Sequence, residues 1–302
     1  MQQKNSLVTV GIPSYNRPGG LDRTLRCILN QSYKNLEIIV SDNCSSDPKV
    51  SDILKEYAAE DNRVTYYIQK QNITIIPNFQ FLLDKANGEY FMWAADDDYW
   101  DLNFIDVCVK AMQANSDVVL CMTDLKFMTL DGKQIDSRLK RSFMHKNLFL
   151  RCFNFVKSTG ENKFFFCGVY KASTVKNISL DNSWGGDHMF LYEVITRGKF
   201  FYISDVANFY YSRGGSSTGM DSVRKAFDIK RKYYFFDSYI LRYTTYQFRF
   251  RHLNFFKKLG LFFSNAMGLV FNEDFILYYI FIKKPIRALI NKIKRKSHEH
   301  NQ

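Results

Sequence analysis

The chain has 302 residues, of which 46% are hydrophobic and 24% are charged, and this composition excludes an intrinsically disordered protein. The net charge of +12 is unevenly placed: residues 1–221 hold 25 Lys or Arg and 25 Asp or Glu, whereas residues 222–302 hold 17 and 5. A body without net charge argues against a protein that coats nucleic acid. The longest apolar stretch near the end, 275–282, is too short to span a bilayer, so we expect no transmembrane helix.

Cysteine usage and short motifs narrow the class of protein further. The six cysteines are scattered without a CxxC pair, which predicts a reducing compartment and argues against a disulfide framework or a zinc site. The polar N-terminus leads directly into a strand-like segment, so no signal peptide is expected. Neither GxGxxG nor GxxxxGK[ST] occurs in the sequence, which excludes a Rossmann fingerprint and a P-loop.

Strand and helix patterns alternate over the first hundred residues. Strands are predicted over 7–12, 36–40, 64–68 and 90–95, and a short helix over 79–86. Leu21, Leu25 and Ile28 recur at helical spacing after the first strand, and Asp47 followed by Pro48 predicts the start of another helix. This βαβ spacing predicts an α/β protein with a mainly parallel sheet and helices on both faces.

The remainder of the chain is less regular. Helices are predicted over 105–112 and 189–196, and strands over 118–122, 164–170 and 200–203. Asp131 and Gly132 predict a hairpin turn between Phe127 and Ile135. The turn content falls after Gly219, and residues 227–263 are predicted to be long and helical. We therefore place a domain boundary near residue 221.

Three consecutive aspartates, Asp96, Asp97 and Asp98, follow the fourth predicted strand and are called the acidic triplet below. Carboxylates this close resist joint ionisation unless a cation or hydrogen-bond donors compensate them, and Mg²⁺ and Mn²⁺ prefer oxygen ligands of this kind. Strand ends are also where open α/β sheets bind ligands. The alternative interpretation is an acidic turn or helix cap.

Three segments carry a resemblance to a known family. They are VTVGIPSYN at 8–16, IIVSDNCSSD at 38–47 and GEYFMWAADDDYW at 88–100. In this order and at this spacing they resemble the GT-A family 2 nucleotide-sugar glycosyltransferases. The resemblance is strong over 6–125, thinner to about 218 and absent beyond that.

The resemblance implies a GT-A, Rossmann-like fold with a mixed, mainly parallel sheet flanked by helices. It implies a catalytic domain over 1–221, with nucleotide-sugar binding in 1–125 and an acceptor-side region in 126–221. A helical, basic and aromatic extension over 222–302 completes the predicted organisation.

The resemblance also implies donor-binding residues. By position, Pro13, Tyr15, Asn16 and Asp42 would hold the nucleoside of a nucleotide-sugar donor. Tyr15 would supply an aromatic wall, and Asp42 would accept a hydrogen bond from a uracil or ribose group. The alternatives are ordinary loop chemistry for Tyr15 and Asn16 and an Asx-type turn for Asp42.

The family's metal-binding DXD signature falls within the acidic triplet, in one of two registers. Alignment on the family's common ending places Ala95 at the first acidic position and Asp97 at the usual metal ligand, whereas DXD spacing alone selects Asp96 and Asp98. We expect Asp97 or Asp98 to bind Mn²⁺ or Mg²⁺ and Asp96 to assist with ribose or charge balance. The cation would offset charge that builds on the departing diphosphate.

Two further residues receive roles from the resemblance. Asp187, in a segment where Gly186 replaces the family's usual first acid, matches the base that deprotonates the acceptor hydroxyl. The alternative is that Asp187 is only the N-cap of a helix from Met189. Arg213, in a segment that resembles the one closing over the pyrophosphate, would pair with phosphate, although the histidine common there is missing and a flexible loop is the alternative.

The C-terminal region interleaves aromatic residues with Lys and Arg. Such basic amphipathic helices lie on anionic membrane surfaces, so the extension is predicted to bind a membrane peripherally. The alternative is that its aromatic residues pack on the catalytic domain and its charges are solvated.

These features predict an inverting, metal-dependent hexosyl- or N-acetylhexosaminyl-transferase. It would move sugar from a UDP-sugar or other NDP-sugar to a glycan or lipid-linked acceptor in bacterial surface polysaccharide or lipooligosaccharide assembly. We expect it in the cytoplasm, peripheral on the inner face of the plasma membrane, with no nucleic acid partner. The competing hypothesis is a non-catalytic membrane or nucleic-acid adaptor that uses the basic tail.

Overall fold

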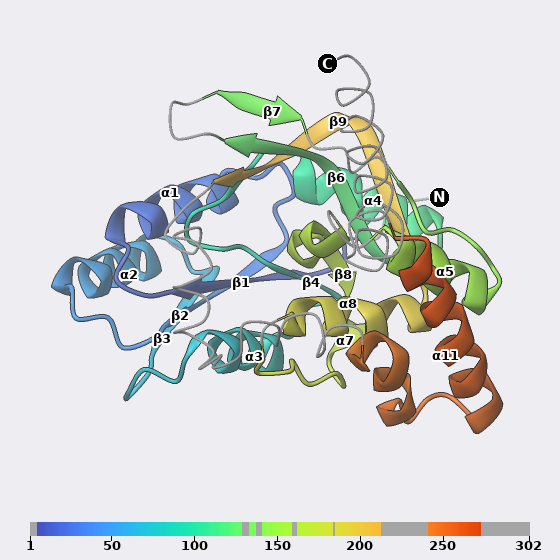
Figure 1. Ribbon diagram of the computed structural model, residues 1–302. Coiled ribbons are helices and arrows are strands. Elements are labelled where there is room, and N and C mark those ends of the chain that lie inside the picture. The colour runs from blue at the N-terminus through green and yellow to red at the C-terminus, as the bar shows by residue number, and fades with distance from the viewer. Residues whose placement is uncertain are drawn as a thin grey trace, which may run out of the picture.

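A nine-stranded sheet in the order β3-β2-β1-β4-β8-β6-β9-β5, with β7 paired to β6, forms the centre of the molecule (Figure 1). The structure is a computed structural model that describes residues 5–128, 133–136, 141–158, 162–183, 185–212 and 241–272. The sheet is mixed, as predicted. Strands β3, β2, β1 and β4 pair in parallel, and β4 then pairs antiparallel with β8, the first strand of the other half.

The parallel half consists of β1 (Val8–Ser14), β2 (Leu36–Asp42), β3 (Val64–Ile68) and β4 (Tyr90–Trp93). All seven residues of β1 are buried, because helices cover both faces of a central parallel strand. The register aligns Ser14 with Asp42, and Gly11 with Trp93. The loops that follow β1, β2 and β4 therefore leave the sheet at the same edge.

The helices of this half are α1 (Pro18–Leu29), α2 (Pro48–Glu60), α3 (Ile75–Lys85) and α4 (Phe104–Ala114). Leu21, Leu25 and Ile28 are buried on α1, and the Asp47 side chain caps α2 by accepting from the Lys49 amide at 3.0 Å. In Figure 1, α1 lies above the parallel strands and α3 lies below them. The predicted alternation of strands and helices is confirmed.

The second half adds β5 (Tyr99–Trp100), β6 (Val118–Met128), β7 (Gln134–Asp136), β8 (Val169–Lys171) and β9 (Lys199–Ser212). Phe127 pairs with Ile135 across an antiparallel ladder, as the predicted hairpin requires, although Asp131 and Gly132 lie outside the described residues. β9 runs parallel to β6 and then pairs antiparallel with β5. This last pairing brings the end of β9 beside the segment that follows the acidic triplet.

Further helices cover this half: α5 (Leu148–Lys157), η1 (Lys163–Cys167), α7 (Ala172–Val175), α8 (Gly186–Arg197), η3 (Tyr246–Arg249) and α11 (Phe255–Val270). Helix α11 packs along α5, and α5 packs against α8. The described part of the C-terminal extension, residues 241–272, therefore rests on the helices of this half of the molecule. Among the described residues, no helix has both the length and the apolar character needed to cross a bilayer.

The strand predicted over 164–170 is wrong in its first half, which is the 3₁₀ helix η1. Phe164 packs against Tyr211, Phe165 against Phe200, and Phe166 stacks on Trp93. A strand has only two faces, whereas a 3₁₀ helix turns successive side chains by about 120° and can direct three neighbours to three different partners.

The long helix predicted over 227–263 is wrong where it can be compared, because the chain breaks between η3 and α11. Asn254 begins α11, and its side chain accepts a hydrogen bond from the Lys257 amide at 3.0 Å. An N-cap of this kind starts a new helix rather than continuing one. Residues 227–240 lie outside the described residues.

Candidate active site

The loop after β1 is fixed to the loop after β2. The Asn16 amide donates to Ser45 Oγ at 2.8 Å, and Asn16 Oδ1 accepts from the Ser46 amide at 2.8 Å. The Asp42 carboxylate, which is 2% exposed, accepts from the Ser45 amide at 3.2 Å and from the Ser45 hydroxyl at 2.5 Å. Asn16 and Asp42 thus hold these loops in shape. This is what the alternative interpretations predict, namely loop chemistry for Asn16 and an Asx-type turn for Asp42.

The other two predicted donor residues lie at the same edge. Pro13 is inside β1 opposite Ser41. Tyr15 directly follows the last residue of β1, and 45% of its surface is exposed. The structure therefore brings Pro13, Tyr15, Asn16 and Asp42 together at one edge of the sheet. Of the four, Tyr15 and Asn16 are exposed, whereas Pro13 and Asp42 are buried.

The acidic triplet faces the N-terminal turn of α1. Arg17 Nη1 lies 3.1 Å from Oδ1 of Asp96 and 2.8 Å from Oδ2 of Asp97. Asp96 and Asp98 are buried, and the Asp97 side chain is 19% exposed. A single guanidinium therefore compensates two carboxylates of the triplet, and the triplet does not point into bulk solvent.

Helix α1 also holds the backbone of the triplet. Arg23 Nη2 donates to the carbonyl oxygen of Asp97 at 3.0 Å, and Thr24 Oγ1 lies 3.3 Å from the carbonyl oxygen of Asp98. A Cβ atom at Gly20 would lie only 2.0 Å from the carbonyl oxygen of Asp96. Sequence reasoning missed these residues, although a glycine inside the first turn of a helix signals a close approach.

Burial changes the proton affinity of Asp96. Burial is the largest effect and raises the pKa of the Asp96 carboxyl. The Arg17 charge and the Tyr15 amide lower this pKa, the Asp97 charge raises it, and the net value is about 6. Burial lowers the pKa of Arg17, but Asp96 and Asp97 outweigh that effect, so its net pKa is raised. Arg17 therefore stays charged, while Asp96 titrates close to neutrality.

An aromatic cluster joins the end of β4 to α8. Trp93 stacks on Phe166 of η1 with ring centroids 4.5 Å apart, and it meets Phe190 of α8 edge-on at 5.4 Å. Stacked and edge-to-face rings of this kind add specific geometry to burial. The first turn of α8 is thereby positioned next to the strand end from which the acidic triplet follows.

Asp187 shares its surroundings with the acidic triplet. Burial raises the pKa of the Cys167 thiol, and the charges of Asp98, Asp97 and Asp187 raise it further. The three carboxylates are therefore acidic neighbours of Cys167, at the end of the η1 helix whose Phe166 packs against both Trp93 and Phe190 of α8.

The interpretation of Asp187 as a helix N-cap is wrong. Helix α8 begins at Gly186, and its N-cap is Gly185, which has a left-handed φ of 75° that favours glycine. Asp187 lies in the first turn, where the helix dipole stabilises a negative charge. A Cβ atom at Gly186 would lie 2.0 Å from the carbonyl oxygen of Asp181, so this position has no room for the family's usual acid.

The C-terminal extension contacts the elements around Asp187. Arg242 forms an ion pair with Asp181 and donates to Ser183 Oγ in the turn that precedes α8. The ring of His188 lies 3.3 Å from the Tyr243 hydroxyl, and burial lowers its pKa. The extension therefore supports the helix that carries Asp187.

Strand β9 ends beside the acidic triplet. Tyr210 pairs with Tyr99, directly after the triplet, and their rings stack with centroids 4.4 Å apart. Asn208 donates two hydrogen bonds to the Asp101 carboxylate, at 2.9 and 2.7 Å. Arg213 lies outside the described residues, one position beyond the end of this strand.

Metal-binding capacity rests on the acidic triplet. The described part of the chain contains no group of three or more His, Cys, Asp or Glu side chains arranged to hold a metal ion. Magnesium-type sites often use only one or two carboxylates and take their other oxygens from substrate phosphates and water. The carboxylates of Asp97 and Asp98 fit such a site when a diphosphate is present.

A comparison with models of protein families identifies the class of protein. The sequence model of Glycosyl transferase family 2 matches residues 9–177, more than half of the chain. The chain therefore belongs to glycosyl transferase family 2, as its sequence motifs predict.

Curated relatives share part of the chain. It is 29% identical over 210 residues to GalNAc(5)-diNAcBac-PP-undecaprenol beta-1,3-glucosyltransferase of Campylobacter jejuni, covering 67% of this chain and 64% of that protein. It is 29% identical over 130 residues to putative teichuronic acid biosynthesis glycosyltransferase TuaG of Bacillus subtilis, covering 43% and 51%. The matches span 18%, 64% and 51% of the lengths of the first three curated relatives.

Solved structures share the fold at low sequence identity. Residues 1–349 of S. aureus TarS superpose with a TM-score of 0.64 at 14% identity, covering 87% of this chain and 71% of that one. Mannosyltransferase PcManGT from Pyrobaculum calidifontis, in complex with GDP-Man and Mn²⁺, gives 0.54 at 15% identity, covering 88% and 71%. The predicted GT-A fold is confirmed.

A matched pair of glycines tests the contact between α1 and the acidic triplet. Gly20→Ala should destabilise the protein by about 1 to 3 kcal/mol, because the new methyl group overlaps the Asp96 carbonyl. Gly19→Ala, one position earlier with open space around it, should be neutral or stabilising by up to about 1 kcal/mol. Urea unfolding measures both, and equal effects at the two positions would contradict the described contact.

The raised pKa of Asp96 predicts a pH-dependent stability difference. The folded protein holds this proton more tightly than the unfolded chain, whose pKa is near 3.8, so ionisation costs stability as the pH rises from about 4 to about 6. At neutral pH this cost amounts to about 3 kcal/mol at most. Asp96→Asn avoids it, so its stability relative to the wild type should improve between pH 4 and pH 7.

Urea unfolding of both proteins in EDTA at these two pH values measures the difference. The effect of Arg17 is already part of the raised pKa of Asp96, so the change in the stability difference between the two pH values reports the titration of Asp96. A difference that does not change with pH would contradict the assignment.

Proposed function

We propose that the protein is an inverting, divalent-metal-dependent glycosyltransferase that uses a UDP-sugar or another NDP-sugar. The observation that carries this proposal is the acidic triplet at the sheet edge that also carries Tyr15 and Asp42, with α8 packed against the same strand end through Trp93, Phe166 and Phe190. The triplet would hold the metal-bound diphosphate, and Asp187 on α8 would serve the acceptor.

The donor would lie across the loops after β1, β2 and β4. Tyr15 provides an exposed aromatic surface for the nucleobase of the donor. Pro13 and Asn16 shape the loop that carries Tyr15. Asp42 and Asp96 offer carboxylate oxygens for nucleoside hydroxyl or N–H groups. Arg213, beyond the described end of β9, would pair with the pyrophosphate.

Asp97 and Asp98 would hold Mn²⁺ or Mg²⁺. When bound, such an ion neutralises charge on the departing diphosphate. The PcManGT structure contains Mn²⁺ with GDP-Man, which supports this choice of cofactor. Because Arg17 already pairs with Asp97, the guanidinium keeps the carboxylate oriented in the metal-free protein.

Asp187 would act as the base. Its carboxylate accepts the proton of the acceptor hydroxyl while the oxygen attacks the anomeric carbon from the side opposite the nucleotide. A single displacement of this kind inverts the anomeric configuration. The position in the first turn of α8 favours the ionised carboxylate that this role requires.

The acceptor and location follow from relatives and from the basic extension. The Campylobacter relative is named for an undecaprenol-linked acceptor, and the Bacillus relative for teichuronic acid biosynthesis. TarS has been solved with UDP-GlcNAc. We therefore favour a glycan or lipid-linked acceptor in surface polysaccharide or lipooligosaccharide assembly, and peripheral attachment of the enzyme to the inner face of the plasma membrane through residues 222–302.

The competing adaptor hypothesis receives no support from the site. Membership in a transferase family and a sheet edge that carries several carboxylates favour catalysis, and the same carboxylates would repel nucleic acid.

Carboxylate substitutions test the roles at the site. Asp187→Asn should lower kcat by about 10²-fold or more and leave donor binding unchanged, since it removes only proton transfer. Asp97→Asn and Asp98→Asn should weaken Mn²⁺-dependent donor binding. Asp52→Asn, an exposed carboxylate on α2, is the matched control and should have no effect.

The measurements are turnover of a panel of nucleotide sugars with Mn²⁺ or EDTA, thermal shift by the same donors, and the anomeric configuration of the product by NMR. Full activity of Asp187→Asn, or turnover that is unaffected by EDTA, would overturn the proposed mechanism.

A further inference from the structure

Helix α11 carries large apolar side chains on its outer face as well as on its inner face, where Leu261 and Leu269 are buried. Its contacts with α5 and α8 also use small and polar residues: a Cβ atom at Gly260 would lie 2.4 Å from the Phe149 ring, and Asn265 is fully buried and donates to the Tyr192 hydroxyl at 2.5 Å. A helix whose outer face meets water normally carries polar side chains on that face.

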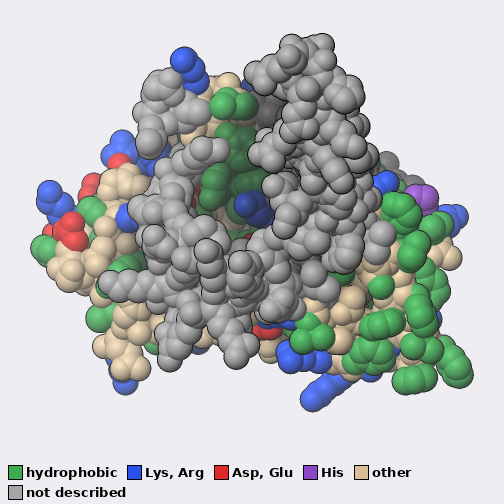
Figure 2. All heavy atoms as spheres, in the orientation of Figure 1, with side chains coloured by type: hydrophobic (Ala, Val, Ile, Leu, Met, Phe, Trp, Pro, Cys, Tyr) green, Lys and Arg blue, Asp and Glu red, His purple; other side chains and the backbone are tan. Residues whose placement is uncertain are grey.

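The outward side chains form one stripe. The exposed apolar residues of α11 and its C-cap are Phe255, Phe256, Leu259, Phe263, Met267 and Phe271. Phe256 is 80% exposed and Phe263 is 60% exposed. Figure 2 shows hydrophobic side chains gathered at the lower right, where Figure 1 places α11. Single exposed apolar residues are ordinary, but a contiguous group marks an interaction surface.

The described residues around the stripe carry positive charge, although Glu273 and Asp274 follow directly in the sequence. Residues 241–272 contain five Lys or Arg and no Asp or Glu. One of these, Arg242, is paired with Asp181, whereas Arg251 and Lys257 are exposed beside the stripe. The surface therefore matches a partner that is both apolar and anionic.

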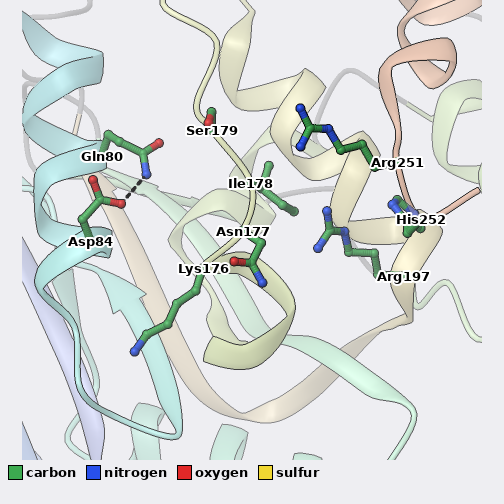
Figure 3. A pocket seen from close by; sticks show the side chains of 9 residues that line it. All are labelled: Gln80, Asp84, Lys176, Asn177, Ile178, Ser179, Arg197, Arg251 and His252. Carbon is green, nitrogen blue, oxygen red and sulfur yellow. Dashed lines mark hydrogen bonds between the residues drawn. The ribbon is translucent and has the colours of Figure 1, made fainter.

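A basic cavity adjoins the beginning of α11. It has a volume of about 740 Å³, and its cationic lining comes from Lys176, Arg197 and Arg251, with His252 beside them and Asp84 opposite (Figure 3). Burial, and then the charges of Arg197, Lys258 and Lys257, lower the pKa of His252 to about 4, so the ring is neutral at physiological pH. The cavity has the size and charge to receive a phosphate group.

We propose that α11 and this cavity form a membrane-docking face that binds an anionic phospholipid bilayer. The phenylalanines of the stripe enter the boundary between headgroups and acyl chains, and Arg251, Lys257 and the cavity contact lipid phosphates. Aromatic residues flanked by Lys and Arg on a helix that lies in the membrane plane are typical of such surfaces. This inference rests on the proposed peripheral attachment and identifies the contact that makes it.

The charge pattern favours a bilayer over other occupants. A second copy of the same face would bring like charges together, which destabilises an interface. The bilayer supplies the apolar layer and the negative charge at once.

Vesicle binding by the full chain tests the docking face. We compare sedimentation with vesicles of phosphatidylcholine plus phosphatidylglycerol and with vesicles of phosphatidylcholine alone. Phe255→Ser combined with Phe256→Ser should weaken binding to anionic vesicles by about tenfold or more, because burial of each ring contributes a factor of that order. Arg251→Glu combined with Lys257→Glu should reduce it by about 20-fold or more and should also reduce the preference for anionic vesicles.

Ile135→Ser is the matched control. Ile135 is 53% exposed on β7, at the opposite end of the view in Figure 1 from α11, so its substitution should leave vesicle binding unchanged. Thermal unfolding confirms that each variant is folded. Because the substituted side chains are exposed, all variants should retain donor hydrolysis in vesicle-free buffer.

Three results would overturn the proposal. The first is that the wild-type protein fails to bind anionic vesicles, and the second is that the variants of the docking face bind them as tightly as the wild type. The third is that these variants differ from the wild type only in the molecular mass of the protein in light scattering, which would assign the face to contact with a second copy. If the wild-type protein binds anionic vesicles but turns over no nucleotide sugar, this would contradict the proposed function and leave the docking face in place.

Discussion

Three neighbouring carboxylates can remain at the end of a buried strand only where positive charge and hydrogen-bond donors face them. Arg17 meets this requirement with one guanidinium between Asp96 and Asp97, and Arg23 and Thr24 hold the peptide carbonyls of the same loop. The first turns of α1 are therefore part of the site, and the glycine at position 20 permits the close approach. The conformation of the loops after β1 and β4 depends on this packing.

The acceptor side is attached to the same loop through aromatic packing. Trp93, at the strand end just before the triplet, contacts η1 through Phe166 and α8 through Phe190. Tyr243 and Arg242 then connect α8 and its preceding turn to the C-terminal extension. Asp187 is thus held by elements from three distant parts of the sequence, and the predicted membrane region also supports the predicted base.

Much of this arrangement follows from the sequence, because continuous apolar runs define parallel strands and the register of such strands collects their following loops at one edge. Asp42 and the acidic triplet were found in this way, whereas Asp187 was assigned only by the family resemblance. Arg17 and Gly20 were missed, since a salt bridge across about 80 residues leaves no local pattern. Residues 164–166 were misassigned because three adjacent phenylalanines fit a strand and a 3₁₀ helix equally well. The outward face of α11 also has no sequence signature, as only tertiary packing decides which side of a helix meets α5.

The pairing of β5 with β9 joins Tyr99 to Tyr210 and so closes a very long loop of chain. Contacts within the first hundred residues are local by comparison, and local contacts form sooner because less chain entropy is lost in making them. During synthesis on the ribosome, β1 to β4 and α1 can assemble while the downstream side of the acidic triplet still awaits its partner strand. The outer edge of the sheet beside the acidic triplet, formed by β5 and β9, is therefore expected to be completed as a late step of folding, after β1 to β4 have assembled.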